Sequence, residues 1–261
     1  MTTDTFDASA WVGQWVFGSG DGESLDKMIR CLLEVGVRGA VFSPIRAVMA
    51  PEPMNANTVL RSQIARRDAD EFAARMAAII NPSLPNWREQ ITAFMDAGDD
   101  TVVACKFIPN YHVYELSDPV MNEVANTLKS LDVPLCVQVR MLDERAHHPR
   151  MLVPGVPIAE IVEFARSHPT LRILACGTYQ SELRQLAEAD NVSVELSSIE
   201  SGNTLMNVLD ILPPDRVMLG THAPVYYPAP AIAKLQGYGI TPETIEMIAT
   251  GNAERFFSQL A

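Results

Sequence analysis

The chain alternates short apolar runs with longer segments in which apolar residues recur every three or four positions. A run of strand length with few polar residues predicts a strand buried on both faces, and the longer period predicts an amphipathic helix. Strands that alternate with helices in this way are typical of a parallel α/β fold. The apolar runs predict eight strands, at residues 6–10, 37–42, 75–80, 101–108, 134–140, 171–176, 191–197 and 216–220.

Residues that begin and end helices stand between these runs. Ser24 is a suitable N-cap for a helix that Gly36 ends, and Asp118–Pro119 and Thr241–Pro242 each pair an N-cap residue with a proline at the first helical position. Eight strands with helices between them in 261 residues predict one domain, a (β/α)8 (TIM) barrel over residues 1–261. A doubly wound open sheet is the alternative, but no Gly-x-Gly-x-x-Gly turn supports it.

Composition narrows the classes of protein that fit. Apolar residues make up 48% of the chain, which is enough for a large core. The 32 acidic and 20 basic residues give a net charge of −12, which opposes binding to nucleic acid or to an anionic membrane. There is no signal-peptide pattern and no run long enough to span a membrane, so a cytoplasmic protein is expected. The four cysteines form no Cys-x-x-Cys motif, which favours free thiols.

Three long connections follow predicted strands, at residues 43–74, 109–118 and 141–157. In a barrel such loops lie at the carboxyl ends of the strands, where active sites are built. Four of the five histidines are therefore predicted on one face, where at least one of His112, His148 and His222 is expected to contact a ligand. The charged loop residues have the alternative role of holding the loops together. The groups gathered around the two later loops are Lys106, Tyr111, His112, Tyr114, Arg140, Asp143, Glu144, Arg145, His147 and His148.

Several segments, in this order along the chain, resemble the amidohydrolase superfamily in its branch of amidohydrolase-related decarboxylases and hydrolases. The resemblance covers nearly the whole chain and implies a (β/α)8 barrel that is commonly dimeric, so a homodimer is expected. The segments that carry it are INPSLPNWREQI, KFIPNYHVYELSDP, DERAHHPRMLVPGV, RVMLGTHAP and IATGNAERFF.

The resemblance also implies where metal ligands would stand, and none of those positions holds its usual residue. Members of the superfamily usually take an His-x-His pair from strand 1, one histidine each from strands 5 and 6, and an aspartate from strand 8. We therefore predict that the chain has no metal ion or other cofactor, and that Trp11 fills the former metal cavity. The corresponding positions here hold Ser9 and Trp11, Gln138, Cys176 or Gly177, and His222.

The first functional hypothesis is a metal-independent enzyme that acts on a small anionic, carboxylated substrate by acid/base chemistry, as a lyase, decarboxylase, isomerase or hydrolase. The general acid or base would be His222, or His112 with Tyr114. Lys106 has the alternative role of forming a Schiff base. The residues predicted to bind the substrate are Lys106, Gln138, Arg140, Arg145 and His148.

Two alternatives remain open at this point. The chain could be a catalytically inactive barrel that serves as a binding module or as a partner subunit. It could also hold a metal at a relocated site. The ligands for such a site would come from His112, His148 and His222 with Asp143, Glu195 or Cys176.

Overall fold

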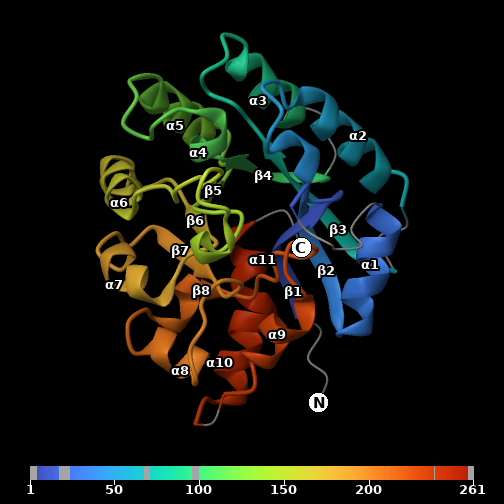
Figure 1. Cartoon of the computed structure of the whole chain (residues 1–261), viewed down its shortest axis with the longest axis vertical. Helices are drawn as coiled ribbons and strands as arrows, with labels where there is room; N and C mark the ends of the chain where they lie inside the picture. Colours follow the sequence, from blue (N-terminus) through green and yellow to red (C-terminus); the bar gives the residue numbers. More distant parts are fainter. Residues whose placement is uncertain (1–4, 18–23, 68–70, 96–99, 238, 258–261) are drawn as a thin grey trace.

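Eight parallel strands follow one another around a barrel, and helices form an outer ring (Figure 1). The computed structural model describes residues 5–17, 24–67, 71–95, 100–237 and 239–257. The predicted (β/α)8 barrel is confirmed, and each predicted strand overlaps an observed one. The strands are β1 (Thr5–Val12), β2 (Val37–Pro44), β3 (Ala73–Ile79), β4 (Val102–Phe107), β5 (Leu135–Gln138), β6 (Ile173–Cys176), β7 (Val192–Glu195) and β8 (Val217–Met218).

The barrel closes between β8 and β1 through backbone hydrogen bonds that continue past the short last strand. The N–H of His222 donates to the carbonyl of Ser9 at 2.9 Å, and the N–H of Trp11 donates to the carbonyl of Ala223 at 2.8 Å. These bonds place the segment after β8 beside the carboxyl end of β1. Two positions that are 211 residues apart, Trp11 and His222, thereby become neighbours.

The helices cover the outside of the barrel with their apolar faces. In α1 the buried side chains are Leu25, Met28, Ile29 and Leu32, which recur at helical spacing. The helices are α1 (Leu25–Glu34), α2 (Met54–Ile64), α3 (Trp87–Met95), α4 (Pro109–His112), α5 (Val120–Ser130), α6 (Ile158–Ser167), α7 (Leu183–Leu186), α8 (Thr204–Leu209), α9 (Pro228–Ala233), α10 (Pro242–Glu246) and α11 (Asn252–Phe256), with 3₁₀ segments at Ile45–Ala47, Glu144–Ala146, Gln180–Glu182 and Pro214–Arg216 and a π-helical turn at Met247–Gly251.

Two of the three predicted helix starts are confirmed. The Ser24 hydroxyl accepts the N–H of Lys27, and the Thr241 hydroxyl accepts the N–H of Thr244. The prediction for Asp118 is wrong: its carboxylate accepts the N–H of Glu115 in the preceding loop, and Pro119 takes the N-cap position of α5.

The long connection after β2 also differs from the prediction, because it contains α2. The polar residue Asn57 breaks the apolar pattern of this segment, yet it is fully buried. Its side-chain amide donates to the carbonyl of Ile79 at 2.6 Å and accepts the N–H of the same residue at 3.0 Å. A buried asparagine therefore serves as a hydrogen-bonding partner at the end of β3.

Two expectations from composition have structural counterparts. Cys31, Cys105, Cys136 and Cys176 form no disulfide bonds, as predicted. Within the described ranges, no helix has both the length and the apolar character needed to cross a membrane.

Candidate active site

The carboxyl end of the barrel is filled by apolar side chains. These residues come from β1, β3 and the loops that follow β1, β2, β4 and β5, and each is almost fully buried. The centre of the barrel mouth, where a substrate would approach the strand ends, is therefore closed. The cluster consists of Trp11, Trp15, Ile45, Ala47, Val48, Ile79, Ile108 and Met141.

A chain of two hydrogen bonds fixes the centre of this closed end. The indole Nε1–H of Trp11 donates to Nδ1 of His222 at 3.0 Å, and Nε2 of His222 lies 2.8 Å from the carbonyl of Met141. Because Nδ1 accepts, the ring proton lies on Nε2 and is donated to that carbonyl. Burial lowers the pKa of His222 to about 3. The imidazole is neutral, and both of its nitrogens are occupied.

Lys106 of β4 places a single ammonium group beneath the indole. Its Nζ lies 3.1 Å from the hydroxyl of Ser9 and 4.4 Å from the centre of the Trp11 ring, and the residue is 1% exposed. The ring face and the hydroxyl together stabilise this buried cation. The ammonium thus contacts the two β1 side chains at the positions where the resemblance implies a His-x-His pair.

The residues at the centre do not fit a divalent metal ion. Trp11 has no ligand atom, His222 has no free nitrogen, and the Lys106 ammonium repels a second cation. Across the described residues there is no group of three or more His, Cys, Asp or Glu side chains that could hold a metal. The amide of Gln138 donates to the carbonyl of Arg140.

Two carboxylates are buried deeper in the barrel. Oδ1 of Asp7 accepts the N–H groups of Ser9 and Thr221, each at 3.0 Å, and Oδ2 accepts the hydroxyl of Thr221 at 2.5 Å. Burial raises the pKa of Asp7 to about 6, and the nearby Glu195 acts in the same direction, although the Thr221 hydrogen bond opposes the rise. Asp7 can therefore exchange a proton near neutral pH.

The carboxylate of Glu195 in β7 is also held by several hydrogen bonds. It accepts the N–H of Gly177 at 2.6 Å, and the N–H and hydroxyl of Ser197 at 2.5 and 2.8 Å. Gly220 makes room for it, since a Cβ there would lie 2.5 Å from the carboxylate. Each buried carboxylate thus bonds to one hydroxyl, Thr221 or Ser197, in the layer above it.

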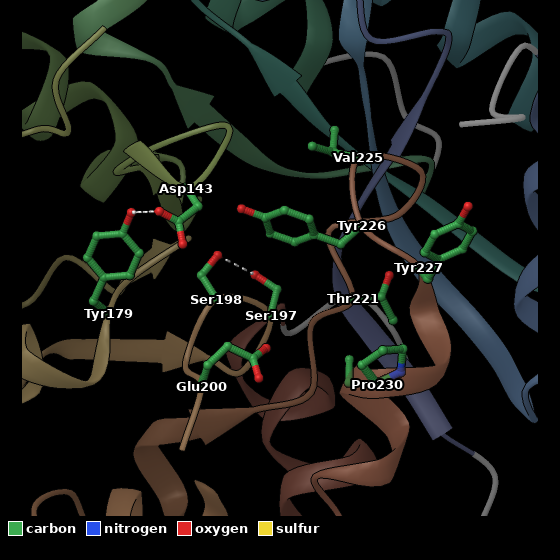
Figure 2. A pocket seen from close by; sticks show the side chains of 11 residues that line it. Asp143, Tyr179, Ser197, Ser198, Glu200, Thr221, Val225, Tyr226, Tyr227 and Pro230 are labelled. Carbon is green, nitrogen blue, oxygen red and sulfur yellow. Dashed lines mark hydrogen bonds between the residues drawn. The ribbon is translucent and has the colours of Figure 1, made fainter. Parts of the chain in front are cut away.

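These two hydroxyls belong to the wall of an open pocket beside the barrel centre. The pocket has a volume of about 440 Å³, which suits a small molecule. Figure 2 shows the phenol of Tyr226 extending between the two walls, toward Asp143 and Ser198. The lining residues are Asp143, Tyr179, Ser197, Ser198, Glu200, Thr221, Val225, Tyr226, Tyr227, Pro230 and Ala231. We call this cavity the hydroxyl pocket.

Both carboxylates that line the hydroxyl pocket have cationic partners. Arg145 forms a bidentate hydrogen bond to Asp143 and lowers the pKa of that carboxyl to about 2. Glu200 lies 2.7 Å from Nζ of Lys234. The two pairs leave hydroxyl groups as the main polar surface that the pocket offers to a ligand.

The predicted substrate-binding arginines are both engaged in ion pairs. Arg140 is 4% exposed and forms a bidentate pair with Glu182 at 2.5 and 2.9 Å, donates to the carbonyl of Gly177, and stacks on Tyr179. The side chain of Arg145 is 86% exposed, but it holds Asp143. The contacts of both arginines are those expected for the alternative role of the charged loop residues, which is to hold the loops together.

The remaining predicted residues do not gather around one ligand. His112 lies against the carbonyl of Ala47 at 3.0 Å, and burial lowers its pKa. Tyr114 is buried against Phe107 in the layer between barrel and helices. His148 is exposed on a different loop surface, where its Nδ1 accepts the N–H of Arg150. The three histidines therefore have separate surroundings and do not come together as ligands of one metal site among the described residues.

The sequence indicated that Tyr226 and Tyr227 either line the mouth or pack in the interior, but it did not single out Asp7, Ser197 or Thr221 as groups that surround a pocket. Asp7 and Ser197 stand in or beside apolar strands, where a polar residue is easily taken for a structural one. Thr221 precedes His222 directly, and the histidine is the more conspicuous residue of the pair. The available signal was an acidic residue inside a strand, since a buried carboxyl group requires several hydrogen bonds.

Comparisons with known proteins agree with this architecture. The family model for amidohydrolases matches residues 14–259, so the chain belongs to the amidohydrolase family. No curated protein gives a significant sequence match to the chain.

Solved structures of low sequence identity share the fold over almost the whole chain. One is the 5-carboxyvanillate decarboxylase LigW from Sphingomonas paucimobilis, with 15% identity, a TM-score of 0.75, and coverage of 98% of this chain and 99% of that one. Another is the 2,6-dihydroxybenzoate decarboxylase from Rhizobium, with 16% identity, a TM-score of 0.71, and coverage of 98% and 99%. A dihydroxybenzoic acid decarboxylase from Polaromonas sp. JS666, which contains bound manganese, has 15% identity, a TM-score of 0.70, and coverage of 98% and 97%.

Proposed function

We propose that the protein is a lyase that decarboxylates a small carboxylated substrate by acid/base chemistry, without a divalent metal ion, and that the substrate binds in the hydroxyl pocket. The structural relatives named above are decarboxylases of aromatic acids, which supports this substrate class. Support for metal independence comes from the barrel centre, where an indole, an imidazole without a free nitrogen and an ammonium group leave no set of ligands.

The observation that carries the proposal is the hydrogen bond between Asp7 and Thr221. Asp7 lies beneath the pocket and has a pKa of about 6, close to the value at which a general acid works best near neutral pH. The hydroxyl of Thr221 connects this carboxyl to the pocket wall at 2.5 Å. A proton held by Asp7 can therefore reach the pocket through one intervening hydroxyl.

In the proposed reaction, Asp7 is protonated and donates to the hydroxyl of Thr221, which reverses the direction of the hydrogen bond between them. Thr221 then gives its own hydroxyl proton to the carbon that bears the carboxylate and receives the proton of Asp7. The carbon–carbon bond to the carboxylate then breaks, and CO2 leaves. The electron pair of that bond restores the aromatic ring of the substrate. Solvent reprotonates Asp7. The hydroxyls of Ser198 and Tyr226 would orient the substrate by hydrogen bonds.

The test measures CO2 release from 2,6-dihydroxybenzoate and 5-carboxyvanillate by purified protein before and after treatment with a chelator. We expect turnover that chelation does not change, and a loss of about 10²- to 10⁴-fold in Asp7→Asn, the range for a removed acid/base group. Asp190→Asn, an exposed carboxyl on the surface, is the matched control and should retain full activity. Turnover that disappears on chelation and returns with manganese would exclude the metal-free mechanism.

A second candidate function is a binding module without catalysis, and the apolar cluster at the barrel mouth favours it. A mouth closed by Trp11 and Met141 excludes substrate from the strand ends, where the fold normally performs chemistry. Under this alternative, the protein releases no CO2 from 2,6-dihydroxybenzoate or from 5-carboxyvanillate. Native mass spectrometry would instead detect a small molecule retained by the wild-type protein and lost when Tyr226→Trp fills the pocket.

A further inference from the structure

A second hollow at the carboxyl end of the barrel shares no lining residue with the hydroxyl pocket. Its volume is about 520 Å³, within the range of small-molecule sites. The walls come from the segment after β1, the loop after β2, α4 and the long loop after β5. The lining includes Trp15, Phe17, Met49, His147, Met151 and Leu152. We call this cavity the aromatic hollow.

The apolar rim of the aromatic hollow is unusually exposed. Phe17, Met49, Met151 and Leu152 are each between 48% and 54% exposed, although they lie side by side around one opening. A contiguous exposed apolar surface of this kind marks a binding site, and methionine side chains adapt readily to the shape of a ligand. The rim therefore favours a ligand that has a flat apolar part.

Two N–H donors in the walls have no partner among the described residues. Nδ1 of His147 accepts the backbone N–H of Val153 at 3.3 Å, so the ring proton of the neutral imidazole lies on Nε2, which is unpartnered. The indole Nε1 of Trp15 is also unpartnered, and that residue is only 4% exposed. Buried donors without acceptors are rare in proteins, and a ligand oxygen would satisfy them.

The aromatic hollow has no charged side chain among the described residues that line it. No aspartate or glutamate is among the described residues that line it, and two adjacent histidines are. This surface differs from the hydroxyl pocket, which has two carboxylates in its walls, and from the chain as a whole, which has a net charge of −12. An anionic group therefore meets less repulsion here than in the hydroxyl pocket.

We propose that the aromatic hollow is a binding site for a small aromatic anion, separate from the site of the proposed reaction. The ring system packs between Trp15 and the apolar rim, and an anionic oxygen accepts N–H groups from Trp15 and His147, whose rings turn slightly toward the ligand. The proposal depends on the contents of this hollow alone and holds whether or not the hydroxyl pocket is catalytic.

The experiment measures binding of 2-naphthoate by isothermal titration calorimetry, with 2-naphthylmethylamine as a probe that has the same ring and the opposite charge. We expect naphthoate to bind at least about tenfold more tightly than the amine. His147→Phe keeps an aromatic ring but removes the donor, and should weaken naphthoate binding roughly tenfold, as expected for a hydrogen bond to a charged group. Trp87→Phe, on the outside of the barrel, is the matched control and should leave binding unchanged.

Two rim variants keep the test independent of folding, because Leu152 is half exposed. Leu152→Glu should weaken naphthoate binding by about fivefold and Leu152→Lys should strengthen it by a similar factor, the effect of a unit charge close to the ligand in water. Equal affinity for the two probes, or an affinity that neither rim variant changes, would overturn the proposal. A protein that forms an oligomer dissociated by Leu152→Glu, and that binds no naphthoate, would show that a second copy covers the hollow instead.

Discussion

The centre of the barrel and the hydroxyl pocket both hold polar side chains near the strand ends, but these side chains differ in how many of their hydrogen bonds are made within the protein. Both ring nitrogens of His222 at the centre form hydrogen bonds within the protein. The guanidinium of Arg140 likewise forms hydrogen bonds to Glu182 and Gly177. In the hydroxyl pocket, the side chains of Ser198 and Tyr226 line open space instead. The comparison teaches that the residue type at a strand end does not decide its role, because a group saturated by protein contacts cannot also bind a substrate.

The largest expected effect is at the closed centre. Trp11→Ala should lower the free energy of unfolding by about 3–5 kcal/mol, since it removes a fully buried tryptophan and leaves a cavity. Urea unfolding monitored by circular dichroism measures the change. Tyr227→Ala, at an 81% exposed residue of the pocket rim, is the control and should change stability by less than about 0.5 kcal/mol. Similar losses in both variants would remove the distinction between centre and rim.

The second largest loss of stability is expected when the ion pair between Arg140 and Glu182 is broken. Arg140→Met leaves the carboxylate of Glu182 without its guanidinium, and breaking a buried pair costs about 3 kcal/mol. The double variant Arg140→Met/Glu182→Leu should recover most of this loss in the same unfolding measurement. If the double variant were no more stable than the single one, the two side chains would not be coupled.

The buried imidazole predicts a dependence of stability on pH. The pKa of His222 is about 3 in the folded protein and about 6.5 in an unfolded chain, so below pH 6.5 the unfolded chain binds a proton that the folded protein does not. The contribution is complete above pH 6.5 and falls by about 1.4 kcal/mol for each pH unit toward pH 3. The stability difference between wild type and His222→Gln should shrink at this rate between pH 6 and pH 4. A difference that does not change with pH would mean that His222 is not a buried neutral ring.

The smallest effect is expected at the exposed arginine of the rim. Arg145→Ala should change the free energy of unfolding by less than about 0.5 kcal/mol, because solvent screens an exposed pair. The same substitution should nevertheless raise the pKa of Asp143 from about 2 toward its ordinary value. A carboxyl titration followed by NMR measures this shift. An unchanged pKa of Asp143 would show that groups other than Arg145 stabilise its ionised form.

Much of the fold could be predicted from sequence, because strands buried on both faces leave continuous apolar runs. The run that ends at Gly220 was recognisable even though only Val217–Met218 form β8. The helix α2 was not recognised, because the buried Asn57 bonds to the backbone of Ile79 and looks like a surface residue in the pattern. A polar residue whose partners lie on another element has no local signature.

The candidate site was predictable only in part for the same reason. The ends of β1 and β8 pointed to Trp11 and His222, but nothing in either segment indicates that one ring nitrogen is reserved for the other residue. Arg140 was expected to bind substrate, and its partner Glu182 stands 42 residues later in the chain. Whether a charged group is free depends on contacts that only the folded chain establishes.

The hydrogen bond between Trp11 and His222 also restricts how this protein can evolve. Replacing the tryptophan alone leaves a buried imidazole nitrogen without its donor, and replacing the histidine alone leaves the indole N–H without its acceptor. Either first step is deleterious, so the two positions are expected to change together or not at all.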